Sequence, residues 1–338
     1  MKKIVFIVHT EYHLIQAVGI IETHYKSEDY YPIIYRVSPL VNGRIGSINE
    51  KELNAEFREF LYDYRRPDNK VKAWANEIVK EHPIRLFIFN EEKFWVTYLL
   101  KRLSAVSCVI ALAPDGAKAY NNFHIERNKY VLELCKSIYY SFRAGMLSTF
   151  PLVEKCYASN KYINEVWVEY PSFYNNNTQK KVVEYHLTEW EKTREILNKV
   201  FRFNSIDIPT KPIILYIDSS VTDDCYYDRV ISMLRIIQCN NPNYNLFIKC
   251  HQVSESIAKE HFKTIGNVHF FESSTPAELI IASLKESILV SVVSTSMLLF
   301  NPTCEYIWLY PCFQDLLNLK TFINPTSHIK VISSITQL

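Results

Sequence analysis

The chain has 338 residues, an apolar fraction of 48% and a formal net charge of +2. This length is too great for one ordinary core and suits two domains. Because the charges nearly balance and form neither a basic arm nor an acidic tail, nucleic acid is not an expected partner.

The first half of the chain alternates short apolar runs with stretches of helical periodicity. An apolar run that passes directly into a helix, as at 3–8 and 11–23, is typical of the start of a doubly wound domain. Strands are predicted at 3–8, 31–37, 85–89, 106–112 and 165–168, and helices at 11–23, 51–62, 70–80, 93–103 and about 121–143.

The composition changes between about 175 and 211, where an Asn-rich loop, a charged helix at 187–201 and two prolines follow one another. We interpret this segment as the connection between domains. Beyond it, strands are predicted at 212–217, 244–249, 268–271, 288–292 and 306–310, and helices at 227–237, 254–264, 276–284 and from Ser296 onward. The alternation of strands and helices predicts an α/β fold with parallel sheets. The sequence shows no internal repeat.

Several common nucleotide-binding and catalytic motifs are absent from the sequence. It contains no G-x-x-x-x-G-K-[ST] motif, which excludes P-loop chemistry, and no G-x-S-x-G nucleophile elbow. Six glycines do not easily build a dinucleotide fingerprint, and none follows the first strand. No D-x-D is present, so the usual sequence sign of a metal-dependent nucleotide-sugar site is missing.

A polar stretch at 113–120 follows the predicted strand at 106–112 and contains Asp115 and Gly116. An Asp-Gly pair is also the commonest turn dipeptide, so a plain turn is the simplest explanation. Ligands in open α/β sheets, however, bind beyond the carboxyl ends of the strands. A carboxylate on such a loop is reachable, and Asp115 is therefore a candidate general base.

His251 follows the predicted strand at 244–249 and occupies the corresponding edge of the second sheet. A lone histidine is more often a surface-loop residue. If the two domains face a common cleft, its imidazole meets the Asp115 carboxylate there, as acid/base chemistry between two substrates requires. Lys249 would support phosphate binding, unless strand alternation turns its side chain away.

Ser294, Thr295 and Ser296 lie between a predicted strand and a predicted helix. Their hydroxyls can cap that helix. Free backbone amides and hydroxyls in the same geometry can also bind a phosphate. The two interpretations are compatible, and both stay open.

Two further segments have an ordinary explanation beside a functional one. Thr275, Pro276 and Glu278 fit a helix N-terminus with a capping box, and the alternative is that Glu278 accepts hydrogen bonds from ribose hydroxyls. The segment Thr10-Glu11-Tyr12-His13 fits an N-cap and a first helical turn, and its position also makes it a candidate acceptor-side loop.

Taken together, these segments resemble bacterial sialyltransferases of the two-domain GT-B type, which include the lipooligosaccharide sialyltransferases and the capsular polysialyltransferases. That family has an acidic-acidic-Gly motif in the first domain and His-Pro and Ser-Ser/Thr motifs in the second. Pro114-Asp115-Gly116, Cys250-His251-Gln252 and Ser294-Thr295-Ser296 are similar to these three motifs in order and spacing. Pro114 replaces the first acidic residue and Gln252 replaces the proline.

Three other segments extend the resemblance over most of the chain. Tyr120 is placed as in many members, Pro276 and Glu278 are similar to the nucleotide-binding helix start, and 10–14 is similar to the first strand–helix junction. The resemblance implies a GT-B fold of two Rossmann-like domains with parallel sheets that face a central cleft. An acceptor-side domain is expected at 1–185, a connecting helix and linker at 186–211, and a CMP-sugar-binding domain at 212–338.

The activity implied by the resemblance is an inverting transfer of sialic acid, or a related nonulosonic acid, from a CMP-sugar to a terminal sugar hydroxyl of a surface glycan, galactose first. Asp115 would be the base and His251 the acid, without metal or cofactor. The expected donor-binding residues are Gly116, Lys249, Pro276, Glu278, Ser294, Thr295 and Ser296, and the expected acceptor-side residues are Thr10, Glu11, Tyr12, His13 and Tyr120.

Other functions remain open. Related transferases use CMP-Kdo or a UDP- or GDP-hexose, and a two-lobed protein that binds a small ligand without catalysis is the alternative of another class. The eight cysteines form no C-x-x-C pair, which argues against a structural zinc site and fits a reducing cytoplasm. The first apolar run is too short for a signal peptide, so we expect a cytoplasmic protein, compatible with peripheral association with the inner membrane. The oligomeric state stays open.

Overall fold

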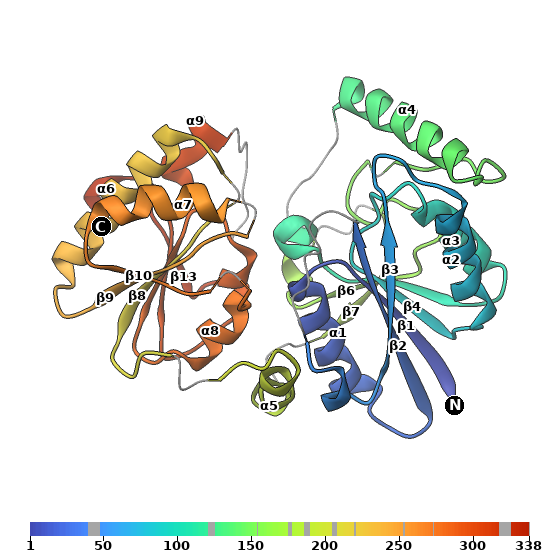
Figure 1. The fold of residues 1–338 in the computed structure, drawn as a ribbon, viewed down its shortest axis with the longest axis horizontal. Helices are drawn as coiled ribbons and strands as arrows, with labels where there is room; N and C mark the ends of the chain where they lie inside the picture. The colour runs from blue at the N-terminus through green and yellow to red at the C-terminus, as the bar shows by residue number, and fades with distance from the viewer. Residues whose placement is uncertain are drawn as a thin grey trace. The chain divides into compact units, whose positions relative to one another are not determined.

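The computed structural model describes residues 1–39, 48–120, 126–153, 155–174, 178–185, 190–204, 208–219, 221–252, 254–272, 274–317 and 326–337. The chain divides into two compact units, Met1–Val200 (unit 1) and Phe201–Leu338 (unit 2) (Figure 1). Each unit has its own parallel sheet with helices packed against it.

Unit 1 contains a seven-stranded parallel sheet in the order β3-β2-β1-β4-β5-β6-β7. The chain enters at β1, adds β2 and β3 on one side, and then crosses to the other side at β4. The order therefore reverses between β1 and β4, the type of position at which open α/β sheets bind ligands. The strands are β1 (Lys2–Val8), β2 (Tyr30–Pro39), β3 (Glu56–Tyr62), β4 (Arg85–Ile88), β5 (Val109–Leu112), β6 (Glu165–Val168) and β7 (Lys181–Glu184), and the helices are α1 (Glu11–His24), α2 (Asn69–Lys80), α3 (Val96–Ser104), α4 (Arg127–Arg143) and α5 (Trp190–Val200).

Unit 2 contains a six-stranded parallel sheet in the order β10-β9-β8-β11-β12-β13. Its order reverses between β8 and β11, as that of unit 1 does between β1 and β4. The strands are β8 (Ile213–Ile217), β9 (Asn245–Lys249), β10 (Val268–Phe270), β11 (Ile288–Ser291), β12 (Glu305–Trp308) and β13 (Ile329–Val331), and the helices are α6 (Asp224–Asn240), α7 (Glu255–Phe262), α8 (Ala277–Ser283) and α9 (Gln314–Leu317).

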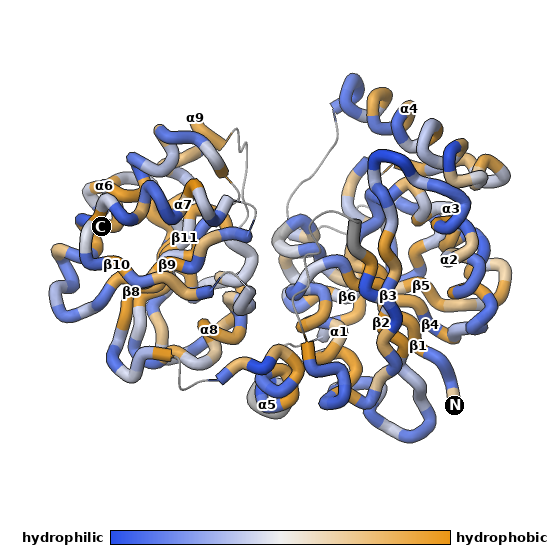
Figure 2. The backbone as a smooth tube through the Cα atoms, viewed as in Figure 1, coloured by the Kyte–Doolittle hydropathy of each residue, from blue (hydrophilic) through white to orange (hydrophobic). Residues whose placement is uncertain are grey.

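The continuous apolar runs become the central strands because helices cover both faces of a parallel sheet. Residues 4–8 of β1 and all five residues of β8 are buried. The inner strands of both sheets are largely hydrophobic in Figure 2. The predicted fold class, α/β with two parallel sheets, is confirmed. Among the described residues, no helix is both long enough and apolar enough to cross a membrane.

The helix predicted at 51–62 is wrong. Its first residues form a 3₁₀ turn, Glu50–Glu52, and the rest is β3, an edge strand of the sheet. Arg58 of β3 pairs with Glu56 in the same strand and also bonds Glu81, outside the strand, at 2.7 Å. Phe60 stacks on Trp74 of α2 with ring centroids 4.5 Å apart. The tertiary contacts thus override a helix-like charge pattern.

Two edge strands, β7 and β13, were not predicted, since both are short and lack a long apolar run. The strand predicted from Val106 begins instead at Val109, because Val106 is exposed and Ser107 has a φ of 59°. The helix predicted at about 121–143 begins at Arg127, and positions 121–125 lie outside the described residues. α5 contacts α1 and belongs to unit 1.

Candidate active site

The carboxyl edge of the unit 1 sheet gathers side chains from three adjacent strands. Thr10 and His13 follow β1, Asn90 follows β4, and Asp115 follows β5. Because these strands are parallel neighbours, residues far apart in sequence reach the same place. Of the residues predicted from sequence, Thr10, His13 and Asp115 are brought together here, and Asn90 is an addition that the sequence analysis missed.

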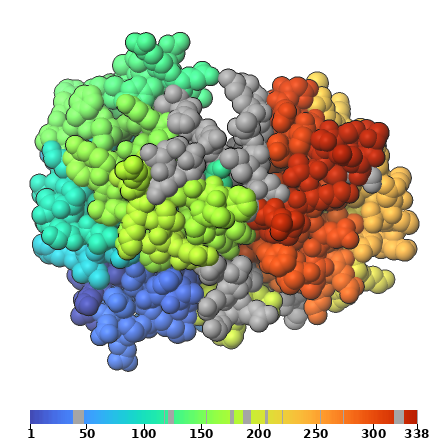
Figure 3. All heavy atoms as spheres, turned by 180° about the vertical axis from the view of Figure 1, so that it is seen from behind, coloured from blue at the N-terminus to red at the C-terminus, as the bar shows by residue number. Residues whose placement is uncertain are grey.

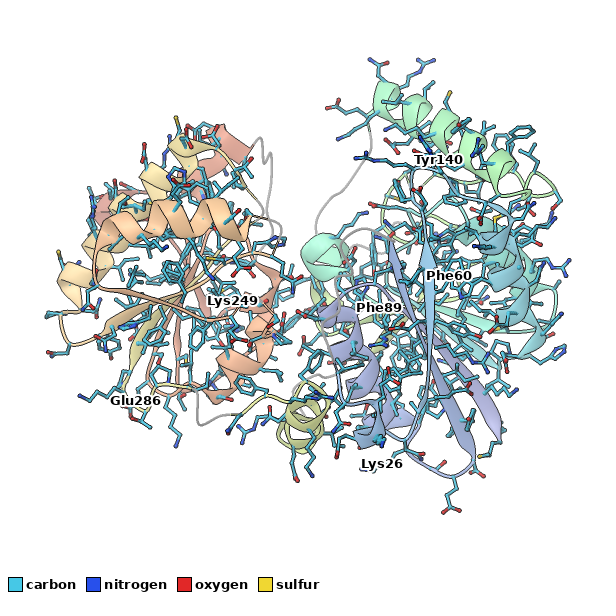
Figure 4. The ribbon with its side chains drawn as sticks, in the orientation of Figure 1. Lys26, Phe60, Phe89, Tyr140, Lys249 and Glu286 are labelled. Atoms are coloured by element: carbon cyan, nitrogen blue, oxygen red, sulfur yellow. The ribbon has the colours of Figure 1, made fainter. Side chains whose placement is uncertain are left out.

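His13 holds Asp115 through a hydrogen bond of 2.8 Å between Nε2 and Oδ1. The other ring nitrogen, Nδ1, accepts the backbone N–H of His9 at 3.2 Å. This second bond makes Nδ1 an acceptor, so Nε2 carries a proton and donates it to the carboxylate in a hydrogen bond. The Thr10 hydroxyl caps α1 by accepting the N–H of His13. The ring of the buried His13 stacks on Phe89, labelled in Figure 4, with centroids 4.8 Å apart.

Asn90 completes the support of Asp115 by donating from Nδ2 to Oδ2 at 3.0 Å. Burial would by itself raise the pKa of Asp115, but the hydrogen bonds from His13 and Asn90 and the charge of Lys118 outweigh it. The pKa of Asp115 therefore lies well below its usual range. The side chain is still 37% exposed. Asp115 is thus an oriented and accessible carboxylate that is ionised at neutral pH.

The loop that carries Asp115 is fixed on both sides. Gln16 of α1 donates to the backbone carbonyl of Pro114 at 2.8 Å and accepts a hydrogen bond from the Tyr185 hydroxyl. Gly116, with a φ of 78°, begins the 3₁₀ helix Gly116–Tyr120 in a backbone conformation that favours glycine. The bonds from Gln16 and the conformation of Gly116 explain how the Pro-Asp-Gly turn holds the Asp115 carboxylate in one position.

Tyr120 is buried, and its hydroxyl accepts the backbone N–H groups of Glu169 and Tyr170. These bonds tie the 3₁₀ helix that follows Asp115 to the segment after β6. Glu11 and Tyr12 lie in the first turn of α1 and are partly buried. Burial raises the pKa of Glu169 to about 8, which adds a second, protonated carboxyl to this edge of the sheet.

Unit 2 contains a pocket of about 340 Å³ at the carboxyl ends of β8, β9 and β11. Three of the residues predicted from sequence, His251, Ser294 and Thr295, line it together. Thr295 begins a four-residue 3₁₀ helix, Thr295–Leu298, and the Ser294 side chain does not cap it. The predicted α-helix from Ser296 is therefore a short turn. The lining residues are Asp218, Ser219, Val221, His251, Val293, Ser294, Thr295 and Leu317.

The capping box predicted for Thr275 and Glu278 is wrong. Pro276 is the residue that precedes α8, and it provides no side-chain cap. Glu278 instead accepts a hydrogen bond of 2.7 Å from the Ser296 hydroxyl, and both side chains are buried. Burial raises the pKa of Glu278, although the bond from Ser296 and the charge of Lys249 act against it. The start of α8 is thus joined to the turn after β11.

Lys249, at the end of β9, is buried, and its ammonium group donates to the Cys250 carbonyl at 3.3 Å (labelled in Figure 4). Its charge acts on two buried carboxyls, Asp218 and Glu278. His251, the next residue but one, is exposed and lines the pocket. The end of β9 therefore brings a buried cation and an exposed imidazole to the same region of unit 2.

Asp218 directly follows β8 and was missed by the sequence analysis, although an acidic residue just past a buried strand was the signal that identified Asp115. Its side chain lines the pocket, and the residue is only 4% exposed. Among the described residues, neither carboxylate oxygen has a hydrogen-bond partner. Burial raises the pKa of Asp218 to about 7. The nearby N–H groups of Ser219 and His251 and the charge of Lys249 lower it, but by less.

Within the described part of the chain, no three His, Cys, Asp or Glu side chains are grouped so that they could hold a metal ion. The polar side chains that line the pocket of unit 2 are the hydroxyls of Ser219, Ser294 and Thr295, the imidazole of His251 and the carboxyl of Asp218. Such groups can bind a phosphate and move protons.

We predict that Asp218→Asn stabilises the protein at high pH. Between an unfolded pKa of about 3.9 and the folded value of about 7, the folded chain retains a proton that the unfolded chain loses. The free energy of unfolding therefore falls as the pH rises through this window. The advantage of the variant over the wild type should grow from near zero at acid pH to at most about 4 kcal/mol above pH 7.

Urea unfolding at pH 5 and pH 8 measures this difference. The exposed Asp228, changed to Asn, is the matched control in the same unit and should give no pH-dependent difference. Parallel pH profiles for Asp218→Asn and the wild type would show that Asp218 is ionised in the folded pocket.

The whole chain is similar to solved structures of nucleotide-sugar enzymes. A sialyltransferase GT-B domain from Photobacterium damselae superimposes with a TM-score of 0.54 at 11% identity over 91% of either chain. A UDP-GlcNAc 2-epimerase from Methanocaldococcus jannaschii gives 0.57 at 10% identity over 99% of this chain and 90% of that one. A Neisseria meningitidis UDP-GlcNAc 2-epimerase bound to UDP-GlcNAc gives 0.50 at 8% identity over 88% and 79%.

No protein-family model matches the chain, and no curated protein matches it in sequence. At identities near 10% the structural likeness shows the fold. The chain therefore has a GT-B-like fold, shared by glycosyltransferases and nucleotide-sugar epimerases.

Proposed function

We propose that the protein is an inverting glycosyltransferase. It moves sialic acid, or a related nonulosonic acid, from a CMP-sugar to a hydroxyl of the terminal sugar of a surface glycan. Galactose is the terminal sugar that we expect first. The observation that carries the proposal is the Asp115 carboxylate, which His13 and Asn90 orient from two neighbouring strands while part of it stays accessible. Its place in a Pro-Asp-Gly turn supports its assignment as the counterpart of the base in the family that the chain resembles.

In the proposed reaction, the acceptor oxygen attacks the anomeric carbon of the donor and its proton passes to Asp115. The new carbon–oxygen bond forms as the bond to the CMP phosphate breaks, so the phosphate leaves with the electron pair and the configuration inverts. Because the carboxylate is ionised at neutral pH, it is ready to accept the proton without a preceding deprotonation. General base help of this kind contributes roughly 10²–10⁴-fold to the rate.

Unit 2 is proposed to bind the donor nucleotide. His251 would protonate or hydrogen-bond the departing phosphate, and the hydroxyls of Ser294 and Thr295 on the same pocket would hold it. The buried Ser296–Glu278 pair, next in sequence to Thr295, would position the start of α8 for the ribose. These protein donors would hold the single phosphate of CMP through hydrogen bonds, and we therefore expect the same turnover in EDTA.

The direct test is to incubate the chain with CMP-Neu5Ac and a panel of galactosides and to measure the release of CMP. Parallel reactions with CMP-Kdo, UDP- and GDP-hexoses test the alternative donors. UDP-GlcNAc without an acceptor tests an epimerase, a class that shares the fold. We expect CMP release that depends on the acceptor. Tight binding of a CMP-sugar without turnover on any acceptor would favour the two-lobed binding protein instead.

Replacement of Asp115 by Asn should lower kcat by roughly 10²–10⁴-fold, because an amide cannot accept the proton at neutral pH. The affinity for CMP should stay unchanged, because unit 2 is proposed to bind the nucleotide. Asp29→Asn, an exposed carboxylate in the same unit, is the control and should keep full activity. Steady-state kinetics together with calorimetric titration of CMP separate the two effects. A variant with near-normal kcat would remove Asp115 from the role of base.

Replacement of His251 by Ala should lower kcat and also weaken CMP binding, because one side chain both contacts the leaving phosphate and assists its departure. The exposed His269 of β10, changed to Ala, provides a matched control in unit 2. CMP titration and initial rates measure both effects. If both stay at wild-type values, His251 does not belong to the donor site.

A further inference from the structure

Helix α4 lies on the surface of unit 1 and contributes little to its core. Of its 17 residues, only Ser137 and Ser141 are buried. In Figure 1 the helix runs along the upper margin of unit 1, and the space-filling view from behind shows its green spheres at the same margin (Figure 3). A helix of this length spans roughly 25 Å. Most of its circumference therefore faces outward.

The outward side of α4 carries a continuous run of large apolar residues. Val131 and Leu132 in the first half and Tyr139 and Phe142 in the second are each more than half exposed, with Phe142 at 65%. Their spacing places them on one side of the helix. Leu147 and Phe150, in the segment after the helix, are exposed to a similar degree. We call these six residues the apolar stripe. Exposed apolar residues concentrated in this way mark an interaction surface.

A row of basic residues runs beside the apolar stripe. Lys129, Lys136 and Arg143 are seven residues apart, which places them within about 40° of one another around the helix axis. With Arg127, the helix has four basic residues and one acidic residue, Glu133. The ion pair between Glu133 and Lys136 is exposed and therefore weak. Figure 2 shows the mixture of hydrophobic and hydrophilic residues along α4.

We propose that α4 binds an anionic membrane surface. The apolar stripe enters the boundary between headgroups and acyl chains, and Lys129, Lys136 and Arg143 contact the anionic headgroups. An apolar face bordered by Lys and Arg is the composition of helices that lie in the membrane interface. The excess of positive charge favours anionic lipid over a second copy of the chain, since two copies of α4 carry like charges.

The binding site is independent of the reaction chemistry of the chain. Binding of α4 to a membrane would add to the proposed function, because a transferase held at the membrane lies next to acceptors that are anchored there. This second step rests on the proposed function. The membrane contact itself does not, and it is measured without donor or acceptor.

The test is flotation of the full chain with vesicles of phosphatidylglycerol and phosphatidylcholine, and with vesicles of phosphatidylcholine alone. We expect binding to the anionic vesicles, at least tenfold weaker binding to the neutral ones, and a decline as salt is added. The variant Leu132→Ser/Phe142→Ser removes part of the stripe, and the variant Lys129→Gln/Lys136→Gln/Arg143→Gln removes the basic row. Each should weaken binding to the anionic vesicles at least tenfold.

Matched controls take exposed residues of the same kind elsewhere in unit 1. Leu61→Ser/Ile84→Ser and Lys80→Gln/Lys101→Gln/Arg102→Gln should bind as the wild type does. Circular dichroism and thermal melting check that each variant is folded, and CMP release with a soluble galactoside should be unchanged in the α4 variants. If the wild type fails to bind anionic vesicles, or the α4 variants bind like the controls, the proposal is wrong. A concentration-dependent dimer that the stripe variant abolishes, without vesicle binding, would assign the surface to a second copy.

Discussion

The hydrogen bond between His13 and Asp115 is the interaction on which the candidate active site of unit 1 depends. It joins the first turn of α1 to the loop after β5, across 102 residues of sequence. The backbone N–H of His9 fixes the imidazole tautomer, and Asn90 holds the second carboxylate oxygen. Each of these partners comes from the end of a parallel strand. The topology of the sheet therefore determines that a single carboxylate is oriented and kept ionised while it stays accessible.

The two units place a carboxyl group in similar positions and give it opposite properties. Asp115 and Asp218 each follow a buried strand at the carboxyl edge of a sheet. Hydrogen-bond donors lower the pKa of Asp115, whereas burial raises that of Asp218 to about 7. The difference lies in the balance of these effects: hydrogen-bond donors outweigh burial at Asp115, and burial outweighs the nearby donors at Asp218. The same residue type is therefore ionised at neutral pH beside one sheet and has its pKa raised to about 7 beside the other.

Much of the fold follows from the sequence, because continuous apolar runs such as 4–8 and 213–217 are typical of strands buried on both faces. The positions of Asp115 and His251 at strand ends follow from the same pattern. The partners of these residues do not, since His13 reaches Asp115 only through the strand order. Local patterns also fail where tertiary contacts decide: β3 has a helix-like charge pattern, and the apolar residues of α4 give no local sign that they stay exposed.

The central proposal is that Asp115 accepts the proton of the acceptor hydroxyl and that His251 contacts the phosphate of the donor. The most direct measurement is a crystal structure of the chain with an unreactive CMP-sugar and a galactoside. We expect the Asp115 carboxylate within hydrogen-bond distance of the acceptor hydroxyl and the His251 imidazole in contact with the phosphate of the donor. A nucleotide bound away from His251, or an acceptor bound away from Asp115, would contradict it.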